Sequence, residues 1–285
     1  MELFQAEALD HGLYRIADAA GTKMYLVVGT ASALLLDCGA GAGDVAAFVR
    51  SLTDKPLRVL ITHGHVDHAM GSGAFGPDVE IYMGEADRDI YREHSALAMR
   101  QGFVARASRL QIGENFQPDC LWYDVRPAKA LLPLHPGDLF DVGGEVAEIC
   151  PGAGHTHGCV TILLRQRRIL LLGDACNPNT FLFDTYSCPV SRYKDTLQAL
   201  RQCTAGRYDR VLLCHGPGDG EMDLIDGAIW LCDAILEGRD DHFPCTPMGK
   251  PAYSAKTISP GATIAAGDIG VHSSANILYS DLTRK

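Results

Sequence analysis

One hexapeptide constrains this chain more than any other feature, because residues 63–68 read HGHVDH. Four of its side chains are potential ligands of a transition metal: His63, His65, Asp67 and His68. The preceding run from Leu57 to Ile61 is apolar and predicts a buried strand. Gly64 lets the backbone turn sharply at the strand end, so that these side chains can converge from one loop. We therefore interpret the hexapeptide as a metal-binding loop, rather than as a polar turn whose histidines cap a helix beginning near Asp67.

The composition is that of a globular chain. Its 285 residues are 47% hydrophobic, which is enough for a sizeable core in one large domain or two small ones. No opening segment resembles a signal peptide, and no run approaches the roughly 20 apolar residues that cross a bilayer. A cytoplasmic location without a membrane partner is expected. The formal net charge of −10 argues against a nucleic-acid partner, because phosphate binding needs clustered Lys and Arg.

Two further residue classes are interpreted as structural. The ten cysteines are scattered without CxxC pairs, and most stand in apolar contexts, so we predict reduced core thiols. Arg165, Arg167 and Arg168 form the one tight basic group, and this group is interpreted as a solvated hairpin turn.

Periodicity predicts alternating short strands and helices along a single domain, residues 1–285. Strands are predicted at 12–18, 23–29, 32–37, 57–61, 80–83, 139–142, 145–149, 160–164, 169–172 and 210–214, with Gly143-Gly144 as a hairpin turn. Helices are predicted at 44–52, 85–101, 193–203 and 224–236. Residues 84–136 are predicted to form a helical, aromatic-rich insertion, which serves as a pocket wall or lid or as a homodimer interface. A C-terminal extension from about 240 adds an edge strand at 275–279.

Three more predicted strands end in a ligand-type residue beside a glycine. The three residues are His155 in the segment GHTHG, Asp174 in the pair Gly-Asp, and His215 in the pair His-Gly. Taken alone, each is more often a hydrogen-bonded loop residue or a turn. Because the same pattern recurs four times when the hexapeptide is counted, we expect the strand ends to share one edge of a sheet.

In order and spacing over roughly residues 12 to 220, these motifs resemble the metallo-β-lactamase-fold superfamily, in particular its dinuclear hydrolases of glyoxalase II and lactonase type. The resemblance implies an α+β fold, an αββα sandwich of two mixed β-sheets flanked by helices, with a dinuclear metal site at one edge. The first metal would be held by His63, His65 and His155. The second metal would be held by Asp67, His68 and His215, and Asp174 would bridge the two.

The chemistry implied by this resemblance is hydrolysis. Two metals about 3.5–4 Å apart can share a water whose pKa falls toward roughly 7, which gives a metal-bridging hydroxide at neutral pH. The same ions polarise the substrate oxygen, and Asp67 would orient the hydroxide or carry a proton to the leaving group. Oxygen and nitrogen ligands favour two Zn²⁺ ions as divalent cofactors, while Fe or Mn are also tolerated.

Departures from the family pattern reduce the number of substrate classes that we expect. Asp174 stands where the commonest classical metallo-β-lactamases have Cys, which argues against antibiotic hydrolysis, and the negative charge disfavours nuclease activity. A small acyl substrate remains: a thioester, an ester or a lactone. Glutathione thioesters are less favoured, because the sequence beyond residue 240 has only four Lys or Arg residues. The alternatives are a mono-iron oxidoreductase that resembles persulfide dioxygenases, β-lactamase or phosphodiesterase activity, and a non-catalytic binding module.

Four residues near the ligands have weaker signals. His157 stands where many relatives have Pro, and it either contacts substrate, supports His155 or is a surface histidine. Tyr186 either donates a hydrogen bond to a substrate oxygen or packs in the core. Cys176 and Cys214 are interpreted as packing thiols, with metal contact as the alternative.

Overall fold

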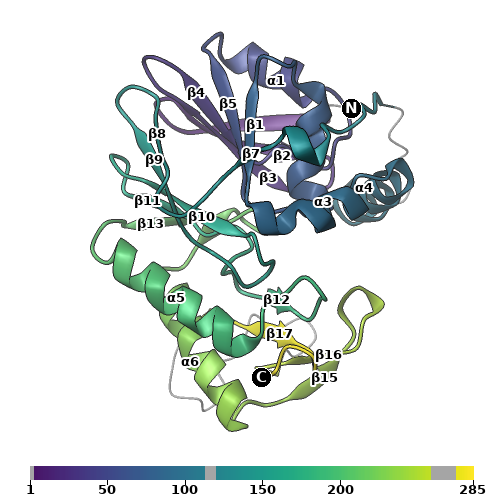
Figure 1. Ribbon diagram of the computed structural model, residues 1–285, viewed down its shortest axis with the longest axis vertical. Helices are drawn as coiled ribbons and strands as arrows, with labels where there is room; N and C mark the ends of the chain where they lie inside the picture. Colours follow the sequence, from purple (N-terminus) through teal and green to yellow (C-terminus); the bar gives the residue numbers. More distant parts are fainter. Residues whose placement is uncertain (1–2, 113–119, 258–273) are drawn as a thin grey trace. The chain divides into compact units, whose positions relative to one another are not determined.

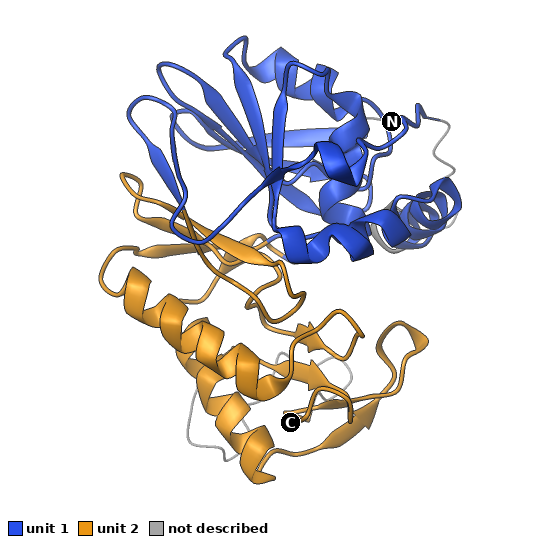
Figure 2. Ribbon diagram, viewed as in Figure 1, with its two compact units in different colours: residues 1–148, 214–216 blue, residues 149–213, 217–285 orange. Residues whose placement is uncertain are grey.

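The computed structural model describes residues 3–112, 120–257 and 274–285, which form two compact units (Figure 2). Unit 1 comprises residues 1–148 and 214–216, and unit 2 comprises residues 149–213 and 217–285. The single domain with an insertion at 84–136 and an extension from about 240 stays a prediction, and parts of both segments lie outside the described residues. Within the described residues, no helix is both long and apolar enough to cross a membrane.

Unit 1 is built on a seven-stranded mixed sheet in which the strands follow chain order (Figure 1). The strands are β1 (Phe4–Asp10), β2 (Leu13–Asp18), β3 (Lys23–Val28), β4 (Ala33–Leu36), β5 (Leu57–Ile61), β6 (Glu80–Met83) and β7 (Leu132–Pro133). Strands β1 to β4 pair antiparallel, and β4 to β7 pair parallel. In the β4–β5 pair Leu36 stands opposite Leu60. The residues that follow these two strands therefore emerge side by side at one sheet edge.

The core of unit 1 lies against this sheet. Ile16, Leu26, Leu35, Val59 and Ile81, one from each of five strands, have no exposed surface. Unit 1 also contains the helical segments α1 (Val45–Leu52), α2 (Val66–Ala69), η1 (Met70–Ala74), η2 (Glu85–Asp87), α3 (Arg88–His94), α4 (Leu97–Ile112) and η3 (Ala128–Ala130). The predicted hairpin at Gly143-Gly144 is confirmed, since β8 (Leu139–Asp141) pairs antiparallel with the first half of β9 (Val146–Pro151).

The helix predicted over 85–101 is wrong, because the chain forms three separate segments there. Helix α3 ends at His94, and the Ser95 hydroxyl donates to the Arg92 carbonyl at 2.7 Å, a local bond that competes with helix continuation. Helix α4 then starts at Leu97 and extends to Ile112, into a region where little regular structure was predicted.

Helix α1 begins at an end that is capped by the Asp44 side chain. The Asp44 carboxylate accepts a hydrogen bond from the Ala47 backbone N–H at 2.8 Å and another from the Tyr123 hydroxyl at 2.7 Å. Asp44→Ala removes both, so we expect the free energy of unfolding to fall by about 1–2 kcal/mol in urea denaturation. Asp44→Asn keeps an acceptor at the cap and should lose clearly less. Equal losses for the two variants would contradict the capping explanation.

Unit 2 contains part of a six-stranded sheet and a separate four-stranded sheet. The first runs in the order β14 (Asp219–Gly220), β13 (Arg210–Leu212), β11 (Ile169–Leu171), β10 (Val160–Leu164) and β9. The second runs in the order β12 (Thr180–Leu182), β17 (Ile277–Tyr279), β16 (Ala252–Ser254) and β15 (Phe243–Cys245), with η4 (Pro247–Gly249) between β15 and β16 in sequence. Helices α5 (Val190–Thr204) and α6 (Leu224–Glu237) pack on each other (Figure 1).

The C-terminal strand differs from its prediction. It was expected at the edge of a sheet over 275–279, but β17 lies between two neighbours. Thr180 of β12 pairs with Ile277 in parallel, and Ser254 of β16 pairs with Leu278 in antiparallel orientation. All three residues of β17 are buried, which explains their apolar composition.

The cysteines are free thiols, as predicted, and seven of the ten are buried. Burial raises the pKa of the Cys176 thiol to about 12, so almost none of it is thiolate at pH 8. We expect iodoacetamide to modify at most the three half-buried thiols rapidly in the native protein: Cys120, Cys203 and Cys245. Mass spectrometry of native and urea-unfolded protein measures this, and rapid native labelling of Cys176 would contradict the burial.

Candidate metal centre

The site begins where β4 and β5 end beside each other. Asp37 follows β4 and Thr62 follows β5. The Thr62 backbone N–H donates to Asp37 Oδ1 at 2.7 Å, and the Thr62 hydroxyl donates to Asp37 Oδ2 at 2.9 Å. Asp37 is fully buried and has a φ of 64°, in the left-handed region. The carboxylate therefore links the two strand ends at the start of the HGHVDH loop.

The loop itself is packed tightly. A Cβ on Gly64 would lie 2.7 Å from Ile90 Cγ2 and 2.9 Å from the Asp87 carbonyl oxygen, so only glycine fits without a shift. The Gly64 N–H donates to the Asp87 carboxylate at 2.9 Å. His63 Nε2 and His65 Nδ1 lie 3.0 Å apart, and the buried His63 is thus paired with a more exposed neighbour. Two imidazole nitrogens this close can share a proton or a metal ion.

Helix α2 starts after His65 and carries Asp67 and His68 in a single turn. Asp67 Oδ2 lies 3.6 Å from His68 Nε2 and 3.4 Å from His215 Nε2. One ligand atom from each of these three residues lies within 4.8 Å of the others, which is compatible with binding one metal ion. His215 is held in unit 1 because the Lys23 N–H donates to the Cys214 carbonyl at 2.8 Å.

A second trio shares His68: Asp37, His68 and Cys214. His68 Nδ1 lies 2.8 Å from Asp37 Oδ2, and Cys214 Sγ lies 3.6 Å from the same oxygen. Because Asp37 already accepts two hydrogen bonds from Thr62, we interpret it as the group that orients His68. With Nδ1 donating to the carboxylate, Nε2 of His68 carries the lone pair that a metal requires.

The negative character of this half of the site extends to Asp18. Burial raises the pKa of its carboxyl to about 6, although the backbone N–H groups of Ala20, Thr22 and Ala40 donate to it. The charge of Asp67 raises it further. The Thr22 hydroxyl, itself buried, donates to Asp67 Oδ2 at 3.3 Å. The part of the site in unit 1 therefore places a second carboxyl group, that of Asp18, close enough to Asp67 for their charges to interact.

Unit 2 holds two of the predicted ligands, His155 and Asp174. His155 Nδ1 lies 2.8 Å from the Phe181 carbonyl oxygen, which can only accept, so Nδ1 donates and Nε2 carries the lone pair. That Nε2 lies 3.9 Å from Asp174 Oδ2. Both side chains are largely buried, at 8% and 12% exposure. The orientation of this pair therefore also fits metal binding.

Tyr193 of α5 shapes the loop that carries His155. A Cβ on Gly154 would lie 2.1 Å from Tyr193 Cδ2, and the Tyr193 hydroxyl donates to the Ala175 carbonyl at 2.7 Å. The Ser187 hydroxyl donates to the His155 carbonyl at 2.9 Å. One buried aromatic ring thus contacts both loops of the pair.

His157, Tyr186 and Cys176, which had weaker sequence signals, differ in their burial. His157 is exposed, and its Nδ1 lies 3.2 Å from the sulfur of the buried Cys188, a contact that was not anticipated. Tyr186 is half-buried. Cys176 is buried, and its Sγ lies 3.5 Å from the Leu224 carbonyl oxygen, in agreement with a packing thiol.

The sequence interpretation missed three residues that contact the ligands: Asp37, Thr22 and His94. Asp37 follows a buried apolar strand and precedes Gly39 by two positions, so the pattern used for the other ligands extends to it. His94 ends α3, and its ring stacks on that of His65 with centroids 5.4 Å apart and an angle of 19°. No sequence signal distinguishes His94 or Thr22.

The comparisons with known proteins show the family of this chain. The family model described as the metallo-beta-lactamase superfamily matches residues 17–215. The acyl-coenzyme A thioesterase MBLAC2 of Gallus gallus is 25% identical over 234 residues, which is 75% of this chain and 81% of that protein. An uncharacterized protein of Mycobacterium tuberculosis is 30% identical over 172 residues, which is 57% of this chain and 64% of that protein.

Solved structures resemble the chain in fold. A metallo-beta-lactamase from Pontibacter korlensis has a TM-score of 0.58 at 19% identity and covers 81% of this chain and 99% of its own. The sec-alkylsulfatase Pisa1 from Pseudomonas sp. has a TM-score of 0.61 at 16% identity, covering 82% of this chain and 42% of its own. These likenesses concern the fold alone, and they confirm the α+β class predicted from the sequence.

Proposed function

Because the chain belongs to the metallo-β-lactamase superfamily, we propose that it is a metal-dependent hydrolase of a small acyl substrate, with a thioester as the first choice. The observation that carries the proposal is the cluster of Asp67, His68 and His215, whose ligand atoms lie within 4.8 Å of one another. The likeness to acyl-coenzyme A thioesterases supports a thioester ahead of an ester or lactone.

We propose that His63, His65 and His155 hold one divalent ion and that Asp67, His68 and His215 hold a second, with Asp174 shared. Imidazole and carboxylate donors suit Zn²⁺, and they also suit Fe or Mn. When bound, such ions supply Lewis acidity toward the thioester carbonyl and lower the pKa of water.

The protein's own contribution is orientation and proton movement. Asp37 and the Phe181 carbonyl fix the rings of His68 and His155 with Nε2 as the ligand atom. The Thr22 hydroxyl donates a hydrogen bond to Asp67 Oδ2. The Asp67 carboxylate can take up a proton from the attacking water and pass it to the departing thiolate. His157 and Tyr186 remain proposed hydrogen-bond donors to the substrate.

The test is a screen in which metal content is measured alongside turnover. Protein loaded with Zn, Fe or Mn is assayed against acyl-coenzyme A thioesters, lactones, carboxyl esters, phosphodiesters and β-lactams, with chelator-treated protein as the control. We expect about two metal ions per chain. We also expect thioesters to be hydrolysed faster than the other substrates, and this activity to stop when the metal is removed by chelation. Turnover of phosphodiesters alone would contradict the proposal, and so would one iron with oxygen consumption on a persulfide.

A further inference from the structure

The connection between β2 and β3 places a buried hydroxyl group beside Asp67. Strand β2 ends at Asp18 and β3 begins at Lys23, so Thr22 is the last residue of this connection. Thr22 is only 1% exposed, and its hydroxyl donates to Asp67 Oδ2 at 3.3 Å. Among the described residues, Asp67 is the one acceptor of this hydroxyl. The contact joins residues that are 45 positions apart, so it depends on the fold of unit 1 and not on a local turn.

The oxygen that accepts this hydrogen bond also faces two imidazole rings. Asp67 Oδ2 lies 3.6 Å from His68 Nε2 and 3.4 Å from His215 Nε2. The terminal torsion of an aspartate side chain is broad, so either carboxylate oxygen could turn toward the imidazoles. A donor on Oδ2 restricts that rotation. The Thr22 hydroxyl therefore favours the orientation in which Oδ2 faces His68 and His215.

Thr22 is itself held in place by Asp18. Asp18 Oδ1 accepts hydrogen bonds from the Ala20 N–H at 2.9 Å and from the Thr22 N–H at 3.0 Å, and Asp18 Oδ2 accepts one from the Ala40 N–H at 3.3 Å. The Asp18 N–H also donates to the Thr22 carbonyl at 3.0 Å. Because both backbone polar groups of Thr22 are bonded to Asp18, the hydroxyl of Thr22 projects from a fixed position.

A neutral donor is well suited to this position. Asp67 and Thr22 are both buried, so water competes little for their hydrogen bond. Within the described part of the chain, no Lys or Arg forms an ion pair with Asp67, whose ion-pair partners are His68 and His215. A lysine or arginine would repel a cation bound by this carboxylate. A threonine hydroxyl orients the carboxylate without adding positive charge.

We propose that Thr22 is a positioning residue for Asp67, and that Asp18 acts on the metal centre through Thr22. This inference rests on the proposed function, because it takes Asp67 as a ligand of a divalent ion. Residues that hydrogen-bond to a metal ligand typically change metal affinity by about 10- to 100-fold. A role in packing alone would change the stability of the protein and leave its metal affinity unaltered.

The experiment measures the Zn²⁺ affinity of the metal-free chain by competition with a chromophoric chelator. It is carried out at pH 8, where Asp18 is ionised because its pKa is about 6. The variants are Thr22→Val, Thr22→Ser, Asp18→Asn and the double variant of Thr22→Val with Asp18→Asn. Valine has the shape of threonine but no hydroxyl, whereas serine keeps the hydroxyl. Urea denaturation of each metal-free variant measures stability separately.

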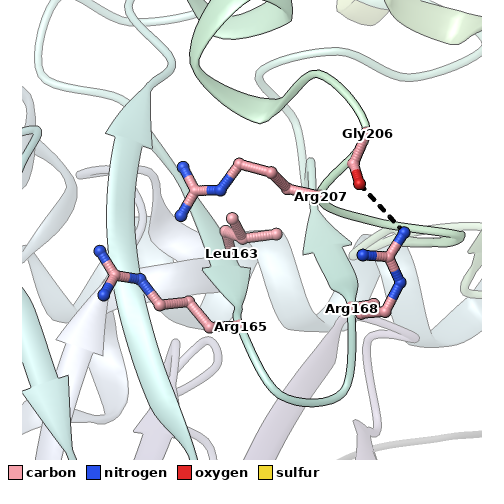
Figure 3. A pocket seen from close by; sticks show the side chains of 5 residues that line it. All are labelled: Leu163, Arg165, Arg168, Gly206 and Arg207. Atoms are coloured by element: carbon pink, nitrogen blue, oxygen red, sulfur yellow. Dashed lines mark hydrogen bonds between the residues drawn. The ribbon is translucent and has the colours of Figure 1, made fainter.

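Two control variants lie outside the site. Thr257→Val removes another threonine hydroxyl that donates to a carboxylate, that of Asp241, at 2.9 Å. Asp209→Asn removes one negative charge and an acceptor of Arg168 Nε. Figure 3 shows Arg168 and its hydrogen bond to the Gly206 carbonyl at a pocket of about 430 Å³. The turn between β10 and β11 that contains Arg168 joins the strand ends opposite to those that lead to the ligand candidates of unit 2.

We expect the Zn²⁺ affinity to fall about tenfold in Thr22→Val and to remain near the wild-type value in Thr22→Ser and in both controls. Asp18→Asn should weaken Zn²⁺ binding in the wild-type background and clearly less in the Thr22→Val background. The reason is that the effects of two residues that act through one contact do not add.

Wild-type Zn²⁺ affinity in Thr22→Val would overturn the proposal, and so would an equal loss in Thr22→Ser, because the hydroxyl would then not be the cause. Equal losses from Asp18→Asn in both backgrounds would show that Asp18 acts independently of Thr22, and would overturn its proposed role. Absence of thioester turnover in the metal-loaded wild type would contradict the proposed function alone, since these affinities need no turnover. A wild-type chain that binds no Zn²⁺ would overturn both.

Discussion

Replacing Asp37 by alanine is expected to lower the free energy of unfolding by about 3–5 kcal/mol. Three buried donors lose their acceptor at once: the Thr62 N–H, the Thr62 hydroxyl and His68 Nδ1. The backbone adds to the cost, because Asp37 has a φ of 64° and alanine tolerates the left-handed region poorly. Urea denaturation of metal-free protein measures the loss without any contribution from bound ions.

Asp37→Asn is the matched control for this prediction. Asparagine keeps the shape and one acceptor oxygen, and it tolerates the left-handed conformation, so the Thr62 contacts can partly persist. We expect a smaller stability loss but a clear weakening of Zn²⁺ binding, on the order of 10- to 100-fold, because His68 is no longer held by a carboxylate. Wild-type metal affinity in this variant would show that Asp37 does not orient His68.

The strand before the hexapeptide and two others were predictable because their sequence signals are local. The strand over 57–61 was predicted with its observed bounds, and so were those over 80–83 and 160–164. Each is a mainly apolar run near turn residues. Strand β1 was missed because most of its residues are exposed and its edge position gives no alternation. Strand β12 was missed because three residues form it and its partner β17 is almost a hundred residues away in the chain.

In the site, too, features with a local sequence signal were predicted and features that depend on tertiary contacts were not. The ligand-type residues at strand ends were found because glycines and apolar runs mark them in the sequence. Their supporting contacts were not found, because they depend on tertiary packing: the stacking of His94 on His65 requires α3 to end where it does, and the Thr22 contact joins residues 45 positions apart. The hairpin turn at Arg165–Arg168 was predicted from its local sequence, and β10 and β11 pair antiparallel on either side of it. Side chains that a helix or turn brings in from elsewhere leave no local pattern.

Replacing Asp67 by asparagine is expected to reduce kcat/KM for the thioester by more than about 100-fold, because even residues that only orient metal ligands change activity by about 10- to 100-fold. The substitution keeps the volume and the contact with the Thr22 hydroxyl, so the fold should be retained. It removes the negative charge between His68 and His215, and we expect the metal content to fall from about two ions per chain toward one. Elemental analysis and steady-state kinetics on the same sample measure both effects.

Asp89→Asn is the control for Asp67→Asn, since Asp89 is an exposed carboxylate on α3 that pairs with Arg92. It should leave metal content and kcat/KM unchanged. If Asp67→Asn lost one metal and kept full turnover, a single ion at the remaining ligands would suffice for catalysis, and the proposed role of Asp67 in proton transfer would be wrong. If it kept both metals and lost turnover, the carboxylate would act on the proton rather than on the ion. The two readouts therefore separate the metal-binding role of Asp67 from its role in catalysis.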